Sequence, residues 1–294
     1  MRKEREQRYT MTDFKVTNYR IHARSEYNSP ESPFSVVFLS DLHNISYGEG
    51  NARLLQEIIS QNPEAVLVGG DMLVAGKEPQ TSEALSLMDR LTRRYPVYYV
   101  NGNHEQKMRE NTELYKDAYK EYSDAIRSLG VHLLENCGAR IRIQKMNFQI
   151  WGYELPLEYY KRGSKRELLP MQIEHALGKP EDGFFHILMA HHPAYFSAYE
   201  KWGADLTLCG HYHGGMIRLP FLGGVVSPQL RLFPEYSRGL FRLENRSMIV
   251  SAGLGSHTIP LRLNNPPELV VIDFIPFSGG RAESNGDTGK TAGV

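Results

Sequence analysis

The chain is poor in cysteine and has no surplus charge. Its 294 residues include two cysteines, Cys137 and Cys209, and no Cys-x-x-Cys pair. Two thiols are too few for a disulfide framework, so we expect reduced cysteines in a reducing compartment. Lys and Arg together number 34 and are balanced by 34 Asp and Glu. Binding to nucleic-acid phosphates requires a basic surplus or a basic face, so we expect no nucleic-acid partner.

Long apolar runs are absent as well. The longest candidates, residues 34–39 and 269–277, have the length of a strand, whereas a membrane span needs about 20 apolar residues. The charged residues 1–8 lead into no apolar segment typical of a secretory signal. These features predict a cytoplasmic protein. With 41% hydrophobic residues, the chain can nevertheless bury a sizeable core.

The two ends of the chain lack apolar periodicity. Residues 1–12 are rich in charge, and residues 278–294 are rich in Gly, Ser, Asp, Asn and Thr. We predict an N-terminal tail over residues 1–12, a single domain over 13–277 and a disordered C-terminal tail over 278–294. No Pro- or Gly-rich linker divides the domain.

Apolar patterning predicts an α/β fold. In the first half, strands are predicted at residues 34–39, 65–68 and 96–100, and helices at 51–60, 82–94 and about 112–129. The second half is richer in strands, which are predicted at residues 131–134, 140–143, 148–151, 184–190, 206–208, 239–243, 248–250 and 269–274. The first three of these suggest an antiparallel meander. Two sheets packed face to face, with helices outside, satisfy both halves.

Polar residues cluster directly after five of the predicted strands. The blocks are Ser40-Asp41-Leu42-His43, Gly69-Gly70-Asp71, Asn101-Gly102-Asn103-His104-Glu105, His191-His192-Pro193 and Cys209-Gly210-His211-Tyr212-His213-Gly214. In open α/β sheets, ligands bind outside the carboxyl ends of the strands. The five blocks are therefore expected to meet at one edge.

The residue types in these blocks favour a metal site. Six of the 11 histidines lie there, beside aspartate and asparagine, and no Ser, Cys or Lys nucleophile has an activating context. Carboxylate, imidazole and amide ligands suit divalent Mn, Fe, Co, Ni or Zn. Seven donors are too many for one four-coordinate metal, but they suit two metals bridged by a carboxylate. Paired metals are typical of phosphoester hydrolysis.

The ordered set D-x-H, G-D, G-N-H, H and G-H-x-H resembles the signature of calcineurin-like metallophosphoesterases. The resemblance spans about residues 34–274, and the stretch 210–240 resembles a bacterial subgroup. It implies a four-layer α/β/β/α sandwich of two mixed β-sheets flanked by helices. It also implies a binuclear metal-dependent phosphohydrolase acting on a small phosphoester, with a phosphodiesterase as the leading interpretation and Mn among the candidate metals. In that mechanism, a hydroxide that bridges the metals attacks phosphorus.

The resemblance assigns seven metal ligands, grouped as a first site, a bridge and a second site: Asp41, His43 and His213; Asp71; and Asn103, His191 and His211. It assigns His104 as the catalytic residue, which stabilises the transferring phosphoryl group or protonates the leaving oxygen. We expect His104 to pair with a carboxylate, for which Asp41 is the candidate. The fourth block holds two histidines, and we choose His191 because it directly follows the strand.

Other residues and activities stay open as alternatives. His192, Glu105 and His257 are expected behind the ligands or at the substrate rim. Phosphomonoesterase and nucleotide- or lipid-pyrophosphate hydrolase activities are alternative reactions, and a non-catalytic metal- or nucleotide-binding interaction module is the alternative of another class. Residues 154–170 are either a solvated loop or a cap over an anionic group. The apolar segment 214–227 leaves peripheral lipid contact possible, and no feature specifies the oligomeric state.

Overall fold

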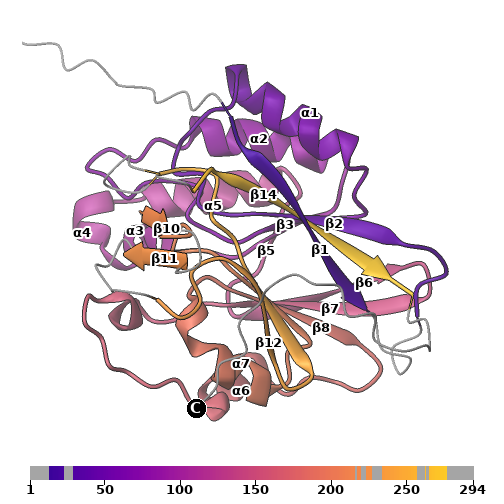
Figure 1. The fold of residues 1–294 in the computed structure, drawn as a ribbon. Coiled ribbons are helices and arrows are strands. Elements are labelled where there is room, and N and C mark those ends of the chain that lie inside the picture. Colours follow the sequence, from indigo (N-terminus) through magenta and orange to yellow (C-terminus); the bar gives the residue numbers. More distant parts are fainter. Residues whose placement is uncertain are drawn as a thin grey trace, which may run out of the picture.

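Two six-stranded sheets lie face to face and helices cover their outer faces (Figure 1). The computed structural model describes residues 13–22, 29–215, 234–256, 262 and 265–276, and the backbone of 217–219 and 223–226. Helices α1 and α2 lie outside the first sheet, and α6 and α7 lie outside the second. The predicted four-layer arrangement is therefore confirmed.

The first sheet is built mainly from the first half of the chain. Its strand order is β1 (Lys15–His22), β14 (Glu268–Ile275), β2 (Phe34–Leu39), β3 (Val66–Val68), β4 (Val97–Tyr99) and β5 (His132–Leu133). The neighbours β2, β3, β4 and β5 are parallel, whereas β14 is antiparallel to β2. The parallel strands consequently deliver their carboxyl ends to one edge.

The second sheet has four central parallel strands and two antiparallel edges. Its order is β12 (Gly239–Leu243), β13 (Arg246–Val250), β9 (Leu206–Cys209), β8 (Phe185–Ala190), β7 (Met146–Tyr153) and β6 (Cys137–Ile143). Strands β13, β9, β8 and β7 pair in parallel. A separate two-stranded sheet joins β10 (Ile217–Leu219) to β11 (Gly223–Val226).

The helices connect the parallel strands. The α-helices are α1 (Ala52–Ser60), α2 (Ser82–Thr92), α3 (Asn103–Glu110), α4 (Thr112–Tyr115), α5 (Ala118–Ser128), α6 (Pro170–Leu177) and α7 (Phe196–Trp202). Short 3-10 turns are η2 (Glu49–Asn51), η3 (Leu157–Tyr160) and η4 (Pro193–Tyr195). No helix of the described ranges has both the length and the apolar character needed to cross a membrane.

Strand β2 shows why the sheets pack as they do. Its side chains alternate between two apolar layers, as the two-residue period of a strand requires. Val37 and Leu39 pack in the cluster with α1 and α2, whereas Val36 and Phe38 pack between the sheets. Because both faces of β2 are buried, its sequence is an almost continuous apolar run.

Two predictions about local structure are wrong in detail, and strand β1 was missed. The predicted helix over residues 112–129 is divided into α4 and α5, because Lys116 adopts a left-handed backbone conformation with φ 51°. The predicted meander is only the β6–β7 pair, since β5 joins the first sheet beside β4. Strand β1 was not predicted, and its alternating, largely polar sequence explains why.

A cluster of phenylalanine rings fastens the two sheets together. Phe274 of β14 is fully buried and lies 5.2 Å from Phe34, 5.1 Å from Phe148 and 5.4 Å from Phe185, measured between ring centroids. Two of these rings belong to the second sheet. Phe274 thus makes apolar contact with rings of both sheets.

Replacing Phe274 by Ala should lower the free energy of unfolding by about 3–5 kcal/mol, because the ring leaves a cavity between two sheets. Chemical denaturation followed by circular dichroism measures the loss. Leu114→Ala is the control, since Leu114 is 49% exposed and should change stability by less than about 0.5 kcal/mol. Equal losses in the two variants would contradict this account of the core.

Candidate metal centre

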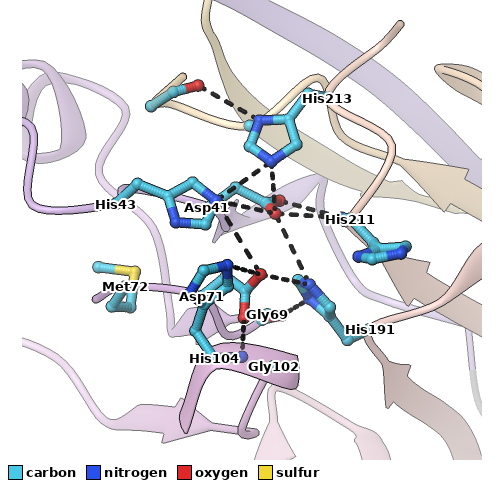
Figure 2. A network of polar contacts seen from close by, with 12 residues as sticks. Asp41, His43, Gly69, Asp71, Met72, Gly102, His104, His191, His211 and His213 are labelled. Carbon is cyan, nitrogen blue, oxygen red and sulfur yellow. Dashed lines mark hydrogen bonds and ion pairs between the residues drawn. The ribbon is translucent and has the colours of Figure 1, made fainter. Parts of the chain in front are cut away.

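Seven of the predicted site residues meet at the carboxyl ends of five strands. Figure 2 shows Asp41 and His43 after β2, Asp71 after β3, His104 at the start of α3, His191 after β8, and His211 and His213 after β9. Their ligand atoms form three groups of closely spaced donors: Asp41, His43 and His213; Asp71, His191 and His211; and His43, Asp71 and His104. Asp71 belongs to two groups and His43 to two, so the groups are contiguous.

Asp71 and His191 form a close contact within the centre. His191 Nε2 lies 3.1 Å from Asp71 Oδ2 and 3.7 Å from Asp41 Oδ1. Neither approach has the geometry of a hydrogen bond to the ring nitrogen. Donors that lie close together without bonding to one another are oriented toward a common point, as the ligands of a cation are.

His43 and His213 show the same convergence. Their Nε2 atoms lie 3.1 Å apart, and His213 Nε2 lies 3.3 Å from Asp41 Oδ1. Two imidazole nitrogens bound to one ion at about 2.1 Å, with an angle between the octahedral and tetrahedral values, are separated by roughly 3–3.4 Å. The pair therefore fits two ligands of one divalent metal.

Backbone carbonyls orient the predicted ligand rings. The Nδ1 atom of His191 lies 2.7 Å from Gly69 O, and that of His43 lies 3.3 Å from Leu73 O. A carbonyl only accepts, so each Nδ1 carries a proton and Nε2 is the nitrogen that faces the centre. Such carbonyl contacts commonly fix the tautomer of metal-ligating histidines.

His104 and His192 have the opposite arrangement. The backbone N–H of Ala75 donates to His104 Nδ1 at 2.9 Å, and that of Ala194 donates to His192 Nδ1 at 3.2 Å. A neutral ring that accepts at Nδ1 carries its proton on Nε2, so it is a hydrogen donor there and not a metal ligand. This distinction favours His191 over His192 as the ligand.

Asn103 brings a buried amide oxygen to the first turn of α3. Its Oδ1 atom has no hydrogen-bond partner among the described residues. Leaving a polar atom buried without a partner costs free energy, and a nearby cation would offset that cost. Asn103 is therefore placed as an oxygen ligand would be, and its role as a ligand stays a prediction.

The loops that carry the predicted ligands have an unusual backbone. Five of these residues adopt left-handed φ values: Asp41 (54°), His43 (49°), Asp71 (53°), His211 (68°) and His213 (50°). Few non-glycine residues do so, and such strain is concentrated at functional sites. Glycine has a separate use here, since a Cβ at Gly102 would collide with the Asp71 carboxylate and one at Gly210 with that of Asp41.

Burial controls the protonation of the two carboxylates. Burial raises the pKa of Asp41 to about 6, although His191 counteracts it. The pKa of Asp71 would also rise on burial, but His191 and His104 hold it well below the ordinary value. Burial and the neighbouring His192 and His191 lower the pKa of His211, which favours a neutral ring. Burial would lower the pKa of His191, but Asp71 and Asp41 raise it to about 10. The two carboxylates thus favour positive charge between them, which a bound cation would supply in place of the His191 proton.

Glu105 supports the centre and does not enter it. Its carboxylate is fully buried and accepts from the backbone N–H groups of Asp71 (2.9 Å), Met72 (2.9 Å) and Gly102 (3.0 Å) and from the Tyr99 hydroxyl (2.9 Å). One side chain therefore joins the loop after β3 to the start of α3. Glu105 thus lies behind the predicted ligands Asp71 and Asn103, whose own role stays a prediction.

The remaining predictions fall at the edge or outside the described residues. His192 packs against His211, with ring centroids 4.7 Å apart. The carboxylate within 4.0 Å of His104 Nε2 is that of Asp71, and the expected pairing with Asp41 is replaced by the Ala75 contact. His257 and the side chains of residues 216–227 lie outside the described residues.

Sequence reasoning missed three residues that hold or contact the ligands. The Asn265 amide donates to the carbonyls of His213 and Gly215. Arg262 donates to the carbonyl of Ala252 at 2.9 Å and lies beside His213. The ring of Tyr160 lies 5.0 Å from that of His211. None stands in a metal-binding motif; the only signal was the aromatic and basic composition around Tyr160.

The fold and the donor set define a metal-dependent hydrolase of phosphoesters, and the comparisons agree. The family model for calcineurin-like phosphoesterases matches residues 34–215. The chain therefore belongs to the calcineurin-like phosphoesterase family, whose members are metal-dependent enzymes that use divalent ions.

The chain is similar to several bacterial proteins. Phosphodiesterase YaeI of Escherichia coli strain K12 is 24% identical over 259 residues, which cover 86% of this chain and 87% of that protein. The uncharacterized metallophosphoesterase YkuE of Bacillus subtilis strain 168 is 25% identical over 242 residues, or 81% of this chain and 78% of that one. The structure of phosphopantetheinyl hydrolase from Mycobacterium tuberculosis has a TM-score of 0.46 and 14% identity, with coverage of 74% and 89%. A similarity at this level says nothing about the substrate.

Substitution of the two adjacent histidines should separate their roles. His191→Ala is expected to lower the bound metal from about two ions per chain to about one, because an Nε2 donor is lost. His192→Ala is expected to keep both ions, because its Nδ1 accepts from Ala194. Elemental analysis of the purified proteins measures the content. Metal loss in His192→Ala, with retention in His191→Ala, would reverse the assignment.

Proposed function

We propose that the protein is a binuclear metal-dependent phosphodiesterase. Asp41, His43 and His213 would hold one ion, and Asn103, His191 and His211 the other, with Asp71 as the bridge. The observation that carries the proposal is the position of Asp71, whose Oδ2 lies 3.1 Å from His191 Nε2 and 3.9 Å from His43 Nε2. One carboxylate is thus within reach of both sets of donors.

The ions, when bound, would lower the pKa of a coordinated water and neutralise charge on the phosphoryl oxygens. The protein orients them. Asp71 Oδ1 accepts from the backbone N–H of His104 at 2.8 Å, and Asp41 accepts from that of His211 at 3.1 Å. In Asp71 this bond fixes Oδ1 and leaves Oδ2 toward the neighbouring rings. In Asp41 both oxygens accept from the His211 N–H, and Oδ1 also faces the rings of His191 and His213.

His104 is proposed to donate a proton or hydrogen bond to the reacting phosphoester. Its Nδ1 accepts from Ala75, so the proton of the neutral ring is on Nε2. Its side chain is 15% exposed, whereas those of His43 and His191 are 1% and 0% exposed. A substrate can therefore reach His104, and the donor nitrogen lies 4.0 Å from Asp71 Oδ2, beside the reacting centre.

The preference for a diester is the finer part of the proposal. It is supported by the similarity to a protein named as a phosphodiesterase over most of both chains. Phosphomonoesters and pyrophosphates remain the alternative substrates. The domain bounds of 13–277, a cytoplasmic location and the choice of manganese stay predictions.

Hydrolysis of bis(p-nitrophenyl) phosphate and p-nitrophenyl phosphate by Mn-reloaded protein tests the proposal. We expect diester cleavage that requires metal and falls by about 10³-fold or more in Asp71→Asn, because the bridging carboxylate is lost. Asp124→Asn is the control, since Asp124 is exposed on α5 and pairs with Lys120. Preference for the monoester would favour a phosphatase, and stoichiometric metal binding without turnover would favour a binding module.

His104→Asn should reduce kcat by on the order of 10²–10⁴ while the metal content is retained, because a positioned proton donor is removed. The loss should be larger for a diester with an alkoxide leaving group than for the p-nitrophenolate ester, whose oxygen needs little protonation. Steady-state kinetics on both esters measure this. His175→Asn, on the exposed face of α6, is the matched control. Loss of metal from His104→Asn would contradict its role as a donor.

A further inference from the structure

A cavity of about 600 Å³ adjoins the proposed metal centre on the side of the second sheet. Its walls come from the loop before α6, from η4 and α7, and from residues 234–236. Pockets that bind small ligands typically have volumes of about 300–1,000 Å³. None of the residues assigned above as metal ligands lines it, so it is a separate feature of the surface.

Two tyrosines connect the cavity to the metal centre. Tyr212 lines the cavity and stands in the chain between the predicted ligands His211 and His213. Tyr195 also lines it, and its ring lies 5.1 Å from that of His192, which in turn lies 4.7 Å from His211. The rings of Tyr195 and His192 therefore lie between the cavity and His211, and a molecule bound by its phosphate at the metals would reach the cavity by extending past them.

Small side chains on one helical face leave the space open. Ala194, Ser197, Ala198 and Lys201 all line the cavity, and their spacing places them on the same side of the η4–α7 segment. Three of the four are alanine or serine, so the ammonium group of Lys201 is the large polar feature of this wall.

The cavity is also lined by cationic side chains from a second element. Lys165 and Arg166 lie in the loop before α6, whereas Lys201 belongs to α7, so the cations come from two separate segments of the chain. Arg166 is fixed by an ion pair with Glu158 at 2.9 Å. Two acids, Glu167 and Glu235, line the cavity too, so the positive charge is local and concentrated at the two lysines and Arg166.

We propose that this cavity binds the part of the substrate that lies beyond the phosphate under attack, and that this part carries a second phosphate. The substrate class is then an organic phosphodiester with a separate phosphate group, held by Lys165 and Lys201. The inference rests on the proposed function for the position of the first phosphate. It assigns a role to the basic part of segment 154–170, for which the sequence left a loop and a cap as alternatives.

Equilibrium binding to the full-length, Mn-loaded protein tests this inference. The probes are adenosine 3′,5′-bisphosphate and adenosine 5′-monophosphate, which differ only by the second phosphate. We expect the wild type to bind the bisphosphate about tenfold more tightly, with a preference that weakens as salt is added. Lys165→Met/Lys201→Met should reduce the preference to about twofold or less. Isothermal titration calorimetry measures both affinities.

Two further variants separate the cavity from general effects. Lys179→Met is the matched control, because Lys179 is exposed and pairs with Glu174 outside the cavity; the preference should be retained. Ser197→Trp fills the space without a change in charge and should weaken bisphosphate binding more than monophosphate binding. A wild type without preference, or a double variant that keeps it, would overturn the inference.

Failure of the cavity inference can be distinguished from failure of the proposed phosphodiesterase activity. The same preparations are assayed for hydrolysis of bis(p-nitrophenyl) phosphate. A lysine-dependent preference in a protein that lacks turnover would support the cavity as a binding site and reject the phosphodiesterase. Turnover without a lysine-dependent preference would support the enzyme and reject the cavity as its second phosphate site.

Discussion

The molecule is organised around two buried carboxylates whose negative charge must be compensated. Asp41 and Asp71 are both almost inaccessible to solvent, and His191 Nε2 lies within 4 Å of each. An ionised carboxylate taken out of water is costly unless opposite charge and hydrogen bonds replace its hydration. Backbone N–H groups supply part of that replacement and imidazoles surround the rest. Divalent ions held by these residues would complete it, so the charge of a bound metal would stabilise the folded protein as well as serve the chemistry.

Sheet topology explains how residues far apart in sequence meet. Asp41 and His211 are separated by 170 positions, yet the backbone N–H of one donates to the side chain of the other. Both follow parallel strands, one in each sheet, and the sheets are fastened by rings such as Phe274. The centre is therefore at the junction of the layers, where each sheet contributes one set of strand ends. Neither half of the chain contains a complete donor set.

Much of this arrangement could be predicted from local sequence, because each motif directly follows an apolar strand. That pattern places Asp41, Asp71 and His191 at the ends of strands. The four-layer fold follows from the family resemblance. The proton positions on His104 and His191 could not be predicted, since they depend on carbonyl and N–H groups of other loops. The left-handed residue Lys116 divides the predicted helix, but no glycine or proline at this position signals the break in the sequence. The contacts of Asn265 and Tyr160 likewise arise only from tertiary packing.

The left-handed backbone at five predicted ligands lowers the stability of the fold at positions that the proposed activity requires. A non-glycine residue in this conformation carries a cost of about 1–2 kcal/mol that glycine avoids. Replacing His211 or His213 by glycine would relieve the backbone and remove a donor in the same step. A substitution that stabilises the fold by relieving the backbone at these positions would therefore cost the protein a donor of the proposed site. Searches for stabilised forms of this protein should leave the strand ends untouched and work on the outer helices.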